Sequence, residues 1–439
     1  MNVKRVLIIA YYWPPSGGSG VQRWLKFVKY LPQFGWKPYV FTPENPSFAI
    51  RDESLLKDVP PEAEIVRFPI WEPYSFFLSI SRLMGRKHSA KPTDLVSGKN
   101  KSIIQSVSTW IRGNLFVPDP RVFWVRPSVK YLRKYLHDQQ ITTVITTGPP
   151  HSLHLIGYQL KKIDPTLRWL ADFRDPWSEW GLLDSLMVGS LARKSHQRLE
   201  NKILTAADEV ITITPFYTRR FEALSKRNVR LLTNGFDTDD FKMLEYAKSE
   251  RFMVRHVGIV NEKCDPRSLM EAVHQLIQEN AQFARQVCVQ FIGEVHADFK
   301  TYVESRDDLR QVTEFMGNIQ HQQLMTLYGS SSLLVLVLTG YKDAEGYLPG
   351  KLFEYMATGL PIMAVGPVNG DAAMVLKETQ AGEMIESHDI AAIKRVLLHE
   401  FIAWKNKNGS DAKNVKAEKY SRRHITQQLA HLLDRQDRP

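Results

Sequence analysis

The sequence lacks several features that define other classes of protein. Only two of its 439 residues are cysteine, Cys264 and Cys288, and they form no metal-ligand pattern. Cysteine used in this way is typical of a reduced, cytoplasmic protein. The sequence has no run of about 18 uncharged apolar residues, so we expect no membrane-spanning helix. The opening MNVKRVLIIAYYWPP has too short an apolar part for a signal peptide and is typical of a buried strand.

Acidic residues are the minority among the charged ones. The chain has 58 Lys and Arg against 47 Asp and Glu, a net charge of +11. A basic balance suits nucleic acid, an anionic membrane surface or a phosphorylated substrate. The chain carries no recognised nucleic-acid motif, so we discount nucleic acid as a partner. It also has no Asp-x-Asp motif beside an apolar strand, and we therefore expect neither a metal ion nor a bound cofactor.

Apolar strands and helices alternate along the chain, and the alternation restarts after its middle. At 439 residues the chain suits two domains of roughly 200 residues each. The first series begins with the apolar run 6–10, which is typical of a parallel strand covered on both faces, and the second begins with a predicted strand at 252–257. We therefore predict an α/β fold with Rossmann-like domains at residues 1–240 and 251–412 and a final helical segment at 413–439.

A glycine-rich loop, YYWPPSGGSG, follows the first predicted strand and precedes a predicted helix over residues 21–31. This order is the phosphate-approach unit of doubly wound folds, because glycines let the backbone come close to a charged ligand. Gly17 and Gly18 are the candidates here, and a plain tight turn is the alternative. The dinucleotide fingerprint is incomplete, because Arg23 stands where its third glycine should be. That departure disfavours a dehydrogenase.

Polar residues also follow two later strands of the first series. His151 lies near the start of the helix after strand 142–146, where it could meet substrate, although a lone histidine there is more often structural. Strand 168–171 ends in Asp172-Phe173-Arg174-Asp175. Ligands bind at the carboxyl edge of open α/β sheets. We predict that Asp175 contacts a sugar or an acceptor, with Arg174 as its partner; the alternative is a salt-bridged turn.

The most informative stretch is DAEGYLPGKLFEYMATGLPIMA, residues 343–364. It predicts a loop punctuated by Pro349-Gly350, a short helix and a buried strand. We expect Glu354 in the first turn of that helix, where free N–H groups and the helix dipole attract phosphate. A carboxylate there can accept two hydrogen bonds from a vicinal diol such as a ribose. The alternative is that Glu354 only complements the dipole.

This stretch resembles the signature of family 4 retaining glycosyltransferases. Those enzymes use nucleotide sugars and have the GT-B fold, in which two Rossmann-like domains face each other across a cleft. Their motif has two glutamates eight residues apart, and the second holds the ribose. Glu354 matches the second glutamate, whereas Gly346 occupies the position of the first and Glu345 lies one residue further away. Either the loop carries a one-residue insertion or the role of the first glutamate has lapsed.

The resemblance implies roles for other positions. Lys263 and Arg267, which follow the strand at 252–257, would neutralise the departing diphosphate, because charge builds on that group as the glycosidic bond breaks. Arg174-Asp175 stands where the family often places a His-Asp pair against the donor sugar. A C-terminal helix would cross back to brace the first domain. The donor-binding positions that the resemblance implies are Gly17, Gly18, Gly258, Gly350, Lys351, Leu352 and Glu354.

We therefore predict a metal-independent retaining glycosyltransferase. It would move a sugar from a nucleoside diphosphate sugar to a glycan or lipid-linked acceptor in cell-envelope polysaccharide synthesis. No dedicated nucleophile is evident, and a front-side route fits what the family suggests. The alternatives are a sugar-nucleotide epimerase of the same fold and a non-catalytic nucleotide-sugar-binding protein, which the displaced first glutamate suggests.

Residues 70–135 are basic and the least regular part of the chain. One predicted helical face there carries apolar residues, and cations flank it. A basic amphipathic helix can lie on an anionic membrane, so we predict peripheral contact with the inner face of the cell membrane. The alternative is a helix packed on its domain, and residues 87–101 are expected to form a mobile loop. The residues concerned are Lys99, Lys101, Ile103, Ile104, Val107, Trp110, Ile111 and Arg112.

Overall fold

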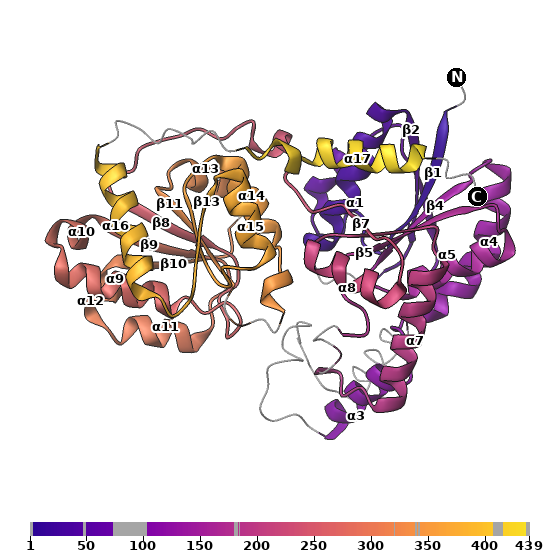
Figure 1. The fold of residues 1–439 in the computed structure, drawn as a ribbon, viewed down its shortest axis with the longest axis horizontal. Coiled ribbons are helices and arrows are strands. Elements are labelled where there is room, and N and C mark those ends of the chain that lie inside the picture. Colours follow the sequence, from indigo (N-terminus) through magenta and orange to yellow (C-terminus); the bar gives the residue numbers. More distant parts are fainter. Residues whose placement is uncertain are drawn as a thin grey trace. The chain divides into compact units, whose positions relative to one another are not determined.

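The computed structural model describes residues 3–46, 50–72, 103–179, 183, 185–319, 321–338, 340, 343–406 and 416–435 (Figure 1). The chain divides into two compact units, Met1–Thr233 with Thr426–Pro439, and Asn234–Ile425. The expected mobile loop at 87–101 lies outside the described residues.

The first unit is built on a sheet of seven parallel strands. Their order is β3-β2-β1-β4-β5-β6-β7, so the direction of winding reverses between β1 and β4. The strands are β1 Lys4–Ile9, β2 Trp36–Pro43, β3 Glu64–Phe68, β4 Thr143–Gly148, β5 Arg168–Phe173, β6 Glu209–Thr212 and β7 Arg230–Leu231. The main helices are α1 Ser19–Tyr30, α3 Ile103–Asn114, α4 Val122–Asp138, α5 Ser152–Ile163, α7 Ser190–Ala206 and α8 Pro215–Ser225.

The second unit repeats this plan with six parallel strands. Their order is β10-β9-β8-β11-β12-β13, and winding reverses between β8 and β11. The strands are β8 Phe252–Val257, β9 Val287–Ile292, β10 Thr313–Gly317, β11 Leu333–Val337, β12 Ile362–Val365 and β13 Gly382–Ile385. The helices are α9 Arg267–Glu279, α10 Ala281–Gln286, α11 Ala297–Glu304, α12 Asp307–Val312, α13 His321–Gly329, α14 Gly350–Thr358, α15 Asp371–Thr379 and α16 Ile390–Asn406.

Helices cover both faces of each sheet, which explains the continuous apolar strands. In the second unit, one core joins the sheet to α9, α11, α12 and α16, and another joins it to α13, α14 and α15 (Figure 1). All six residues of β8 are buried. The predicted α/β class is therefore confirmed. The sequence reading missed β13, an edge strand in which only Ile385 is buried.

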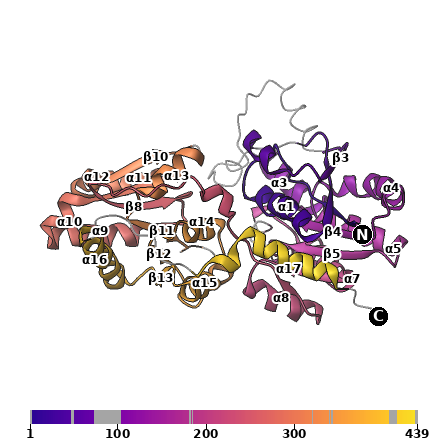
Figure 2. The ribbon, with the colours of Figure 1, turned by 90° about the horizontal axis from the view of Figure 1, so that it is seen from above.

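The final helix, α17 Arg422–Asp434, begins later than predicted. Before it, Glu418–Tyr420 form a 3₁₀ turn, and Ser421 forms a parallel β-bridge with Phe236. From Thr426 onward the helix belongs to the first unit, along which it runs in Figure 2. The Arg168 guanidinium donates hydrogen bonds to the carbonyls of Leu432 at 2.8 Å and Leu433 at 2.6 Å. None of the helices that the structure describes has the length and hydrophobicity that a membrane crossing requires.

Candidate functional site

Several of the predicted site residues follow strands at the points where the strand order reverses. Each unit has one such switch point, between β1 and β4 in the first unit and between β8 and β11 in the second. Gly17 and Gly18 follow β1, and His151 follows β4. In the second unit, Gly258 follows β8, and the loop at 343–349 lies between β11 and α14. At such a reversal the connections that leave the carboxyl ends of the two neighbouring strands lead to opposite faces of the sheet, and ligands of open α/β sheets bind in the resulting crevice.

Glycine is required at positions 17 and 18 of the first loop for different structural reasons. The Gly17 N–H donates to the Ile50 carbonyl at 3.0 Å, and a Cβ atom added at Gly17 would lie 2.8 Å from Ile50 Cγ2. Gly18 has a φ of 90°, a conformation that favours glycine, and an added Cβ there would meet open space. Gly18 is also the N-cap of α1, whose first turn has no acidic residue. The start of α1 can therefore accommodate an anion.

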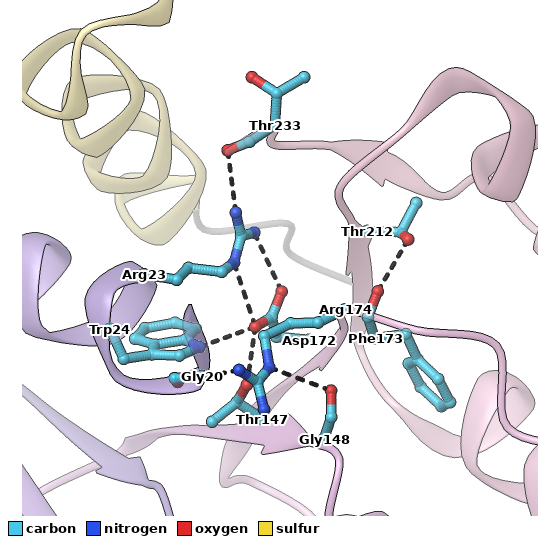
Figure 3. A network of polar contacts seen from close by, with 10 residues as sticks. All are labelled: Gly20, Arg23, Trp24, Thr147, Gly148, Asp172, Phe173, Arg174, Thr212 and Thr233. Atoms are coloured by element: carbon cyan, nitrogen blue, oxygen red, sulfur yellow. Dashed lines mark hydrogen bonds and ion pairs between the residues drawn. The ribbon is translucent and has the colours of Figure 1, made fainter. Parts of the chain in front are cut away.

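Arg23, which breaks the dinucleotide fingerprint, belongs to a buried network (Figure 3). Its Nη2 lies 3.0 Å from Asp172 Oδ1 and its Nε 3.3 Å from Oδ2, while Nη1 donates to the Thr233 carbonyl at 2.9 Å. Trp24 Nε1 and the Thr147 hydroxyl also donate to Asp172, at 2.7 and 2.9 Å. Arg23 thus ties α1 to the end of β5. Sequence reasoning did not find this pair.

Arg174, which we predicted as the partner of Asp175, makes no hydrogen bond or ion pair with it in the described part of the chain. Its guanidinium donates instead to three backbone carbonyls, Gly20 at 2.9 Å, Gly148 at 3.3 Å and Pro149 at 2.5 Å; Figure 3 shows the first two. Arg174 therefore fixes the glycine-rich loop against the loop after β4. The positive charge of Arg174 nevertheless acts to lower the pKa of the Asp175 carboxyl group.

Asp175 makes no hydrogen bond or ion pair with any residue that the structure describes. Burial raises the pKa of its carboxyl group, and the negative charge of Asp172 adds to that rise, while Arg174 opposes it. A partly buried carboxylate at the carboxyl edge of a sheet with its acceptor atoms unused is suited to contact a hydroxyl group.

His151 lies in a packed aromatic stack. Its ring is stacked on Trp177 with the centroids 4.9 Å apart and the planes 4° apart, and only 5% of the residue is exposed. Burial lowers the pKa of His151 well below its usual value of 6.5, and the neighbouring His154 lowers it further. The ring is therefore neutral at pH 7. This placement favours the structural role that the sequence left open for His151.

A second buried network lies beside the first switch point, and sequence reasoning missed it. The Tyr11 hydroxyl donates to Glu72 Oε1 at 2.8 Å, and Arg121 Nε lies 3.0 Å from the same oxygen. The Arg121 guanidinium also lies 4.7 Å from the centre of the Tyr11 ring. These residues are far apart in the sequence, so no local pattern reveals them.

In the second unit, Glu354 is the fifth residue of α14 and lies in its second turn. The expectation of a first-turn position was wrong, because the helix begins at Gly350 and Pro349 is its N-cap. Glu354 Oε2 accepts hydrogen bonds from Lys351 Nζ at 2.5 Å and from the Tyr328 hydroxyl at 3.2 Å. Its side chain is 31% exposed. Its Oε1 has no partner among the described residues.

The other residues predicted near this helix differ in how they can meet a ligand. Gly350 is exposed, and an added Cβ there would have no neighbour within 4 Å. Leu352 is fully buried, and its N–H donates to the Pro349 carbonyl at 3.1 Å. Its side chain therefore packs in the core beneath α14 and does not face a ligand. Glu345 lies in a short 3₁₀ turn, Ala344–Gly346, with its side chain exposed.

The loop after β8 is fixed to the loop after β11. The Gly340 N–H donates to the Lys263 carbonyl at 2.9 Å, which brings Lys263 to the switch point. Gly258 has a φ of 155°, and its N–H donates to the Ile292 carbonyl at 2.9 Å. Arg267 is the first residue of α9 and forms an ion pair with Asp265. That ion pair leaves Arg267 less charge to offer a ligand.

Comparisons with known proteins agree with the fold. Residues 251–399 match the family model described as "Glycosyl transferases group 1". No curated protein sequence matches the chain. Among solved structures, the chain is similar to a glycosyltransferase from Rickettsia africae ESF-5, with a TM-score of 0.61, 13% identity and 98% of each chain covered.

Two further solved structures are similar over nearly the whole chain. Sucrose-phosphate synthase from Thermosynechococcus elongatus has a TM-score of 0.59 and 16% identity, with 98% of each chain covered. Anabaena HepE, solved in complex with UDP-glucose, has a TM-score of 0.57 and 14% identity, covering 98% of this chain and 99% of HepE. These likenesses establish the GT-B fold. The family match covers residues 251–399, which lie in the second unit, so that part of the chain is similar to the group 1 glycosyltransferases.

Proposed function

We propose that the chain is a retaining glycosyltransferase of family 4, which transfers a sugar from a nucleoside diphosphate sugar without a metal ion. The observation that carries the proposal is Glu354. It presents a carboxylate oxygen without a partner among the described residues, one turn inside a helix that begins at a switch point. That oxygen can accept a hydrogen bond from a ribose, while the start of α14 faces the attached phosphates.

The charge of the departing diphosphate would be met by Lys263 and by the N–H groups at the starts of α1 and α14. Lys263 is held at the second switch point through its carbonyl, and its exposed position leaves the side chain accessible to solvent. Fixed cations and N–H groups lower the barrier because they are already oriented toward the charge that develops. Lys351 would contribute once a ligand draws it away from Glu354.

For the acceptor, Asp175 is the residue we favour. It lies at the carboxyl edge of the first sheet, and none of its hydrogen-bonding capacity is used by the described residues. A hydroxyl of a glycan or of a lipid-linked sugar could donate to it. The front-side route needs no protein nucleophile, because the acceptor oxygen itself bonds to the anomeric carbon on the face from which the diphosphate leaves, and the leaving phosphate takes the proton of that hydroxyl.

A surface of the first unit favours an acceptor at a membrane. We call it the α3–α7 surface, and it comprises Trp110, Arg112, Leu115, Met187, Leu191 and Lys194. The Asn114 side chain joins its two parts, donating to the Met187 carbonyl at 3.1 Å and accepting from the Gly189 N–H at 2.8 Å. Four apolar members are exposed, Leu191 by 81%. Exposed apolar side chains next to cations suit an anionic lipid surface.

The test of this function is a thermal-shift screen with nucleoside diphosphate sugars, followed by an assay of the product. A transferase releases nucleoside diphosphate only when an acceptor is present, apart from slow hydrolysis. An epimerase converts the donor sugar without any acceptor. A non-catalytic binding protein is stabilised by the donor but releases no nucleoside diphosphate with any acceptor. Stabilisation by none of the donors would contradict all three functions.

A further inference from the structure

The carboxylate of Glu354 is held from two sides through one of its two oxygens. Oε2 accepts from Lys351 Nζ at 2.5 Å, one helical turn earlier, and from the Tyr328 hydroxyl at 3.2 Å. A carboxylate oxygen has two lone pairs, so these donors satisfy Oε2. The partly exposed side chain therefore offers Oε1, which has no partner in the described part of the chain, as its remaining acceptor.

Tyr328 is well placed to hold this carboxylate rigidly. It lies near the end of α13 and is fully buried, so its ring has no freedom to turn away. Burial together with the negative charge of Glu354 raises its pKa well above the ordinary value, so the hydroxyl remains a donor at every physiological pH. Among the described residues, the only hydrogen-bond partner of that hydroxyl is Glu354.

The tyrosine is itself fixed to the sheet. Its ring packs edge-on against Tyr355, with the centroids 5.9 Å apart and the planes 78° apart. The Tyr355 hydroxyl accepts from the Val257 N–H at 2.8 Å, at the last residue of β8. The position of Glu354 is thus connected through two tyrosines to β8, the strand that precedes Gly258.

We infer that Tyr328 is a positioning residue for ribose recognition: by occupying Glu354 Oε2 it fixes Oε1 toward the nucleotide. This inference rests on the proposed function, because it assigns Tyr328 a part in the same donor site. Without the hydroxyl, the carboxylate can rotate about its last bond, and Lys351 can follow it. The ribose hydroxyl would then meet a mobile acceptor, which costs entropy on binding.

The test compares Tyr328→Phe with the wild type in binding UDP and GDP and their 2′-deoxy and 3′-deoxy forms. The ribose forms should bind the variant about five- to tenfold more weakly, the size of effect that one ordinary hydrogen bond supports. The forms lacking the contacted hydroxyl should bind both proteins equally. The preference for ribose therefore falls in the variant. A purely structural tyrosine would weaken all forms alike or none of them.

Tyr420→Phe is the matched control. Tyr420 is also a buried tyrosine of the second unit, and its hydroxyl donates to Glu378 at 3.1 Å. This variant should keep the ribose preference of the wild type. An unchanged preference in Tyr328→Phe, with normal nucleotide binding, would overturn the positioning role and leave the proposed function standing. Failure of the wild type to bind any of these nucleotides would overturn both.

Discussion

Arg23 on α1 and Asp172 at the end of β5 form a fully buried ion pair through two hydrogen bonds, although 149 residues separate them in the sequence. The pair occupies the place where a dinucleotide-binding protein has its third glycine. Trp24 and Thr147 donate two further bonds to the same carboxylate, so three donors converge on Oδ2 and one on Oδ1. The first unit is therefore a Rossmann-like domain whose helix and sheet are joined by charge rather than by close glycine packing.

Removal of one partner of the Arg23–Asp172 ion pair should destabilise the first unit strongly. We expect Arg23→Met to lower its free energy of unfolding by about 3–5 kcal/mol, because Asp172 would be left as an uncompensated buried charge. Urea denaturation followed by tryptophan fluorescence measures this. Lys134→Ala is the control, since it breaks the exposed pair with Asp138 and should cost less than about 1 kcal/mol. Equal losses of unfolding free energy in the two variants would show that the buried pair stabilises the protein no more than the exposed pair does.

Buried histidines should make the protein less stable in mild acid. Burial lowers the pKa of His154 to about 3. In the unfolded chain this pKa returns to its ordinary value of about 6.5. Between about pH 3 and 6.5, the unfolded state therefore binds a proton at His154 that the folded state does not bind. The stability that this group contributes is fully present above pH 6.5 and is lost as the pH falls from 6.5 toward 3.

His154→Gln should flatten that pH dependence. One such histidine lowers the free energy of unfolding by about 2 kcal/mol at pH 5 relative to pH 7. The wild type should therefore lose more stability between these pH values than the variant does. His137→Gln removes an exposed histidine and should keep the slope of the wild type. Denaturation midpoints at pH 5 and pH 7 measure the effect, and parallel curves for the wild type and His154→Gln would contradict it.

The α3–α7 surface should bind anionic vesicles. Leu191→Ser combined with Lys194→Glu should reduce co-sedimentation with phosphatidylglycerol vesicles, because it removes apolar area and reverses a charge. The binding of the wild type should weaken in about 1 M salt, which screens charges beyond about 3 Å.

Ile402→Ser combined with Lys405→Glu is the matched pair for the vesicle experiment. It changes an exposed apolar residue and a cation at the same spacing on α16 of the second unit. We expect it to bind vesicles like the wild type. Charge reversal at Lys99, Lys101 and Arg112 extends the test along the chain. If no variant changes co-sedimentation, the proposed membrane contact fails.

The sequence predicted the fold because the fold depends on local patterns. A short, continuous apolar run such as 6–10 favours a strand buried on both faces, and the glycines and Pro349 mark the turns between elements. These signals are confirmed in both sheets. The edge strand β13 was missed because three of its four residues are not fully buried and its apolar run is short.

The candidate site could be read from sequence only in part. The position of Glu354 on a helix after β11 follows from its neighbours in the chain. Its contact with Tyr328 depends on how α13 packs beside α14, and no local pattern encodes that packing. The same limit applies to Arg174. Adjacent charges in a sequence suggest a pair, but the backbone points Arg174 toward carbonyls of other loops.

The most direct test of the account is donor binding by Glu354→Ala. At a concentration of about 100 times its dissociation constant, the best donor of the thermal-shift screen should stabilise the wild type by about 2.7 kcal/mol. Glu279→Ala, which removes another helical glutamate paired with a lysine, should keep that stabilisation. We predict that Glu354→Ala loses it while the ligand-free variant unfolds at nearly the temperature of the wild type. An unchanged response to the donor in Glu354→Ala would contradict the proposed site.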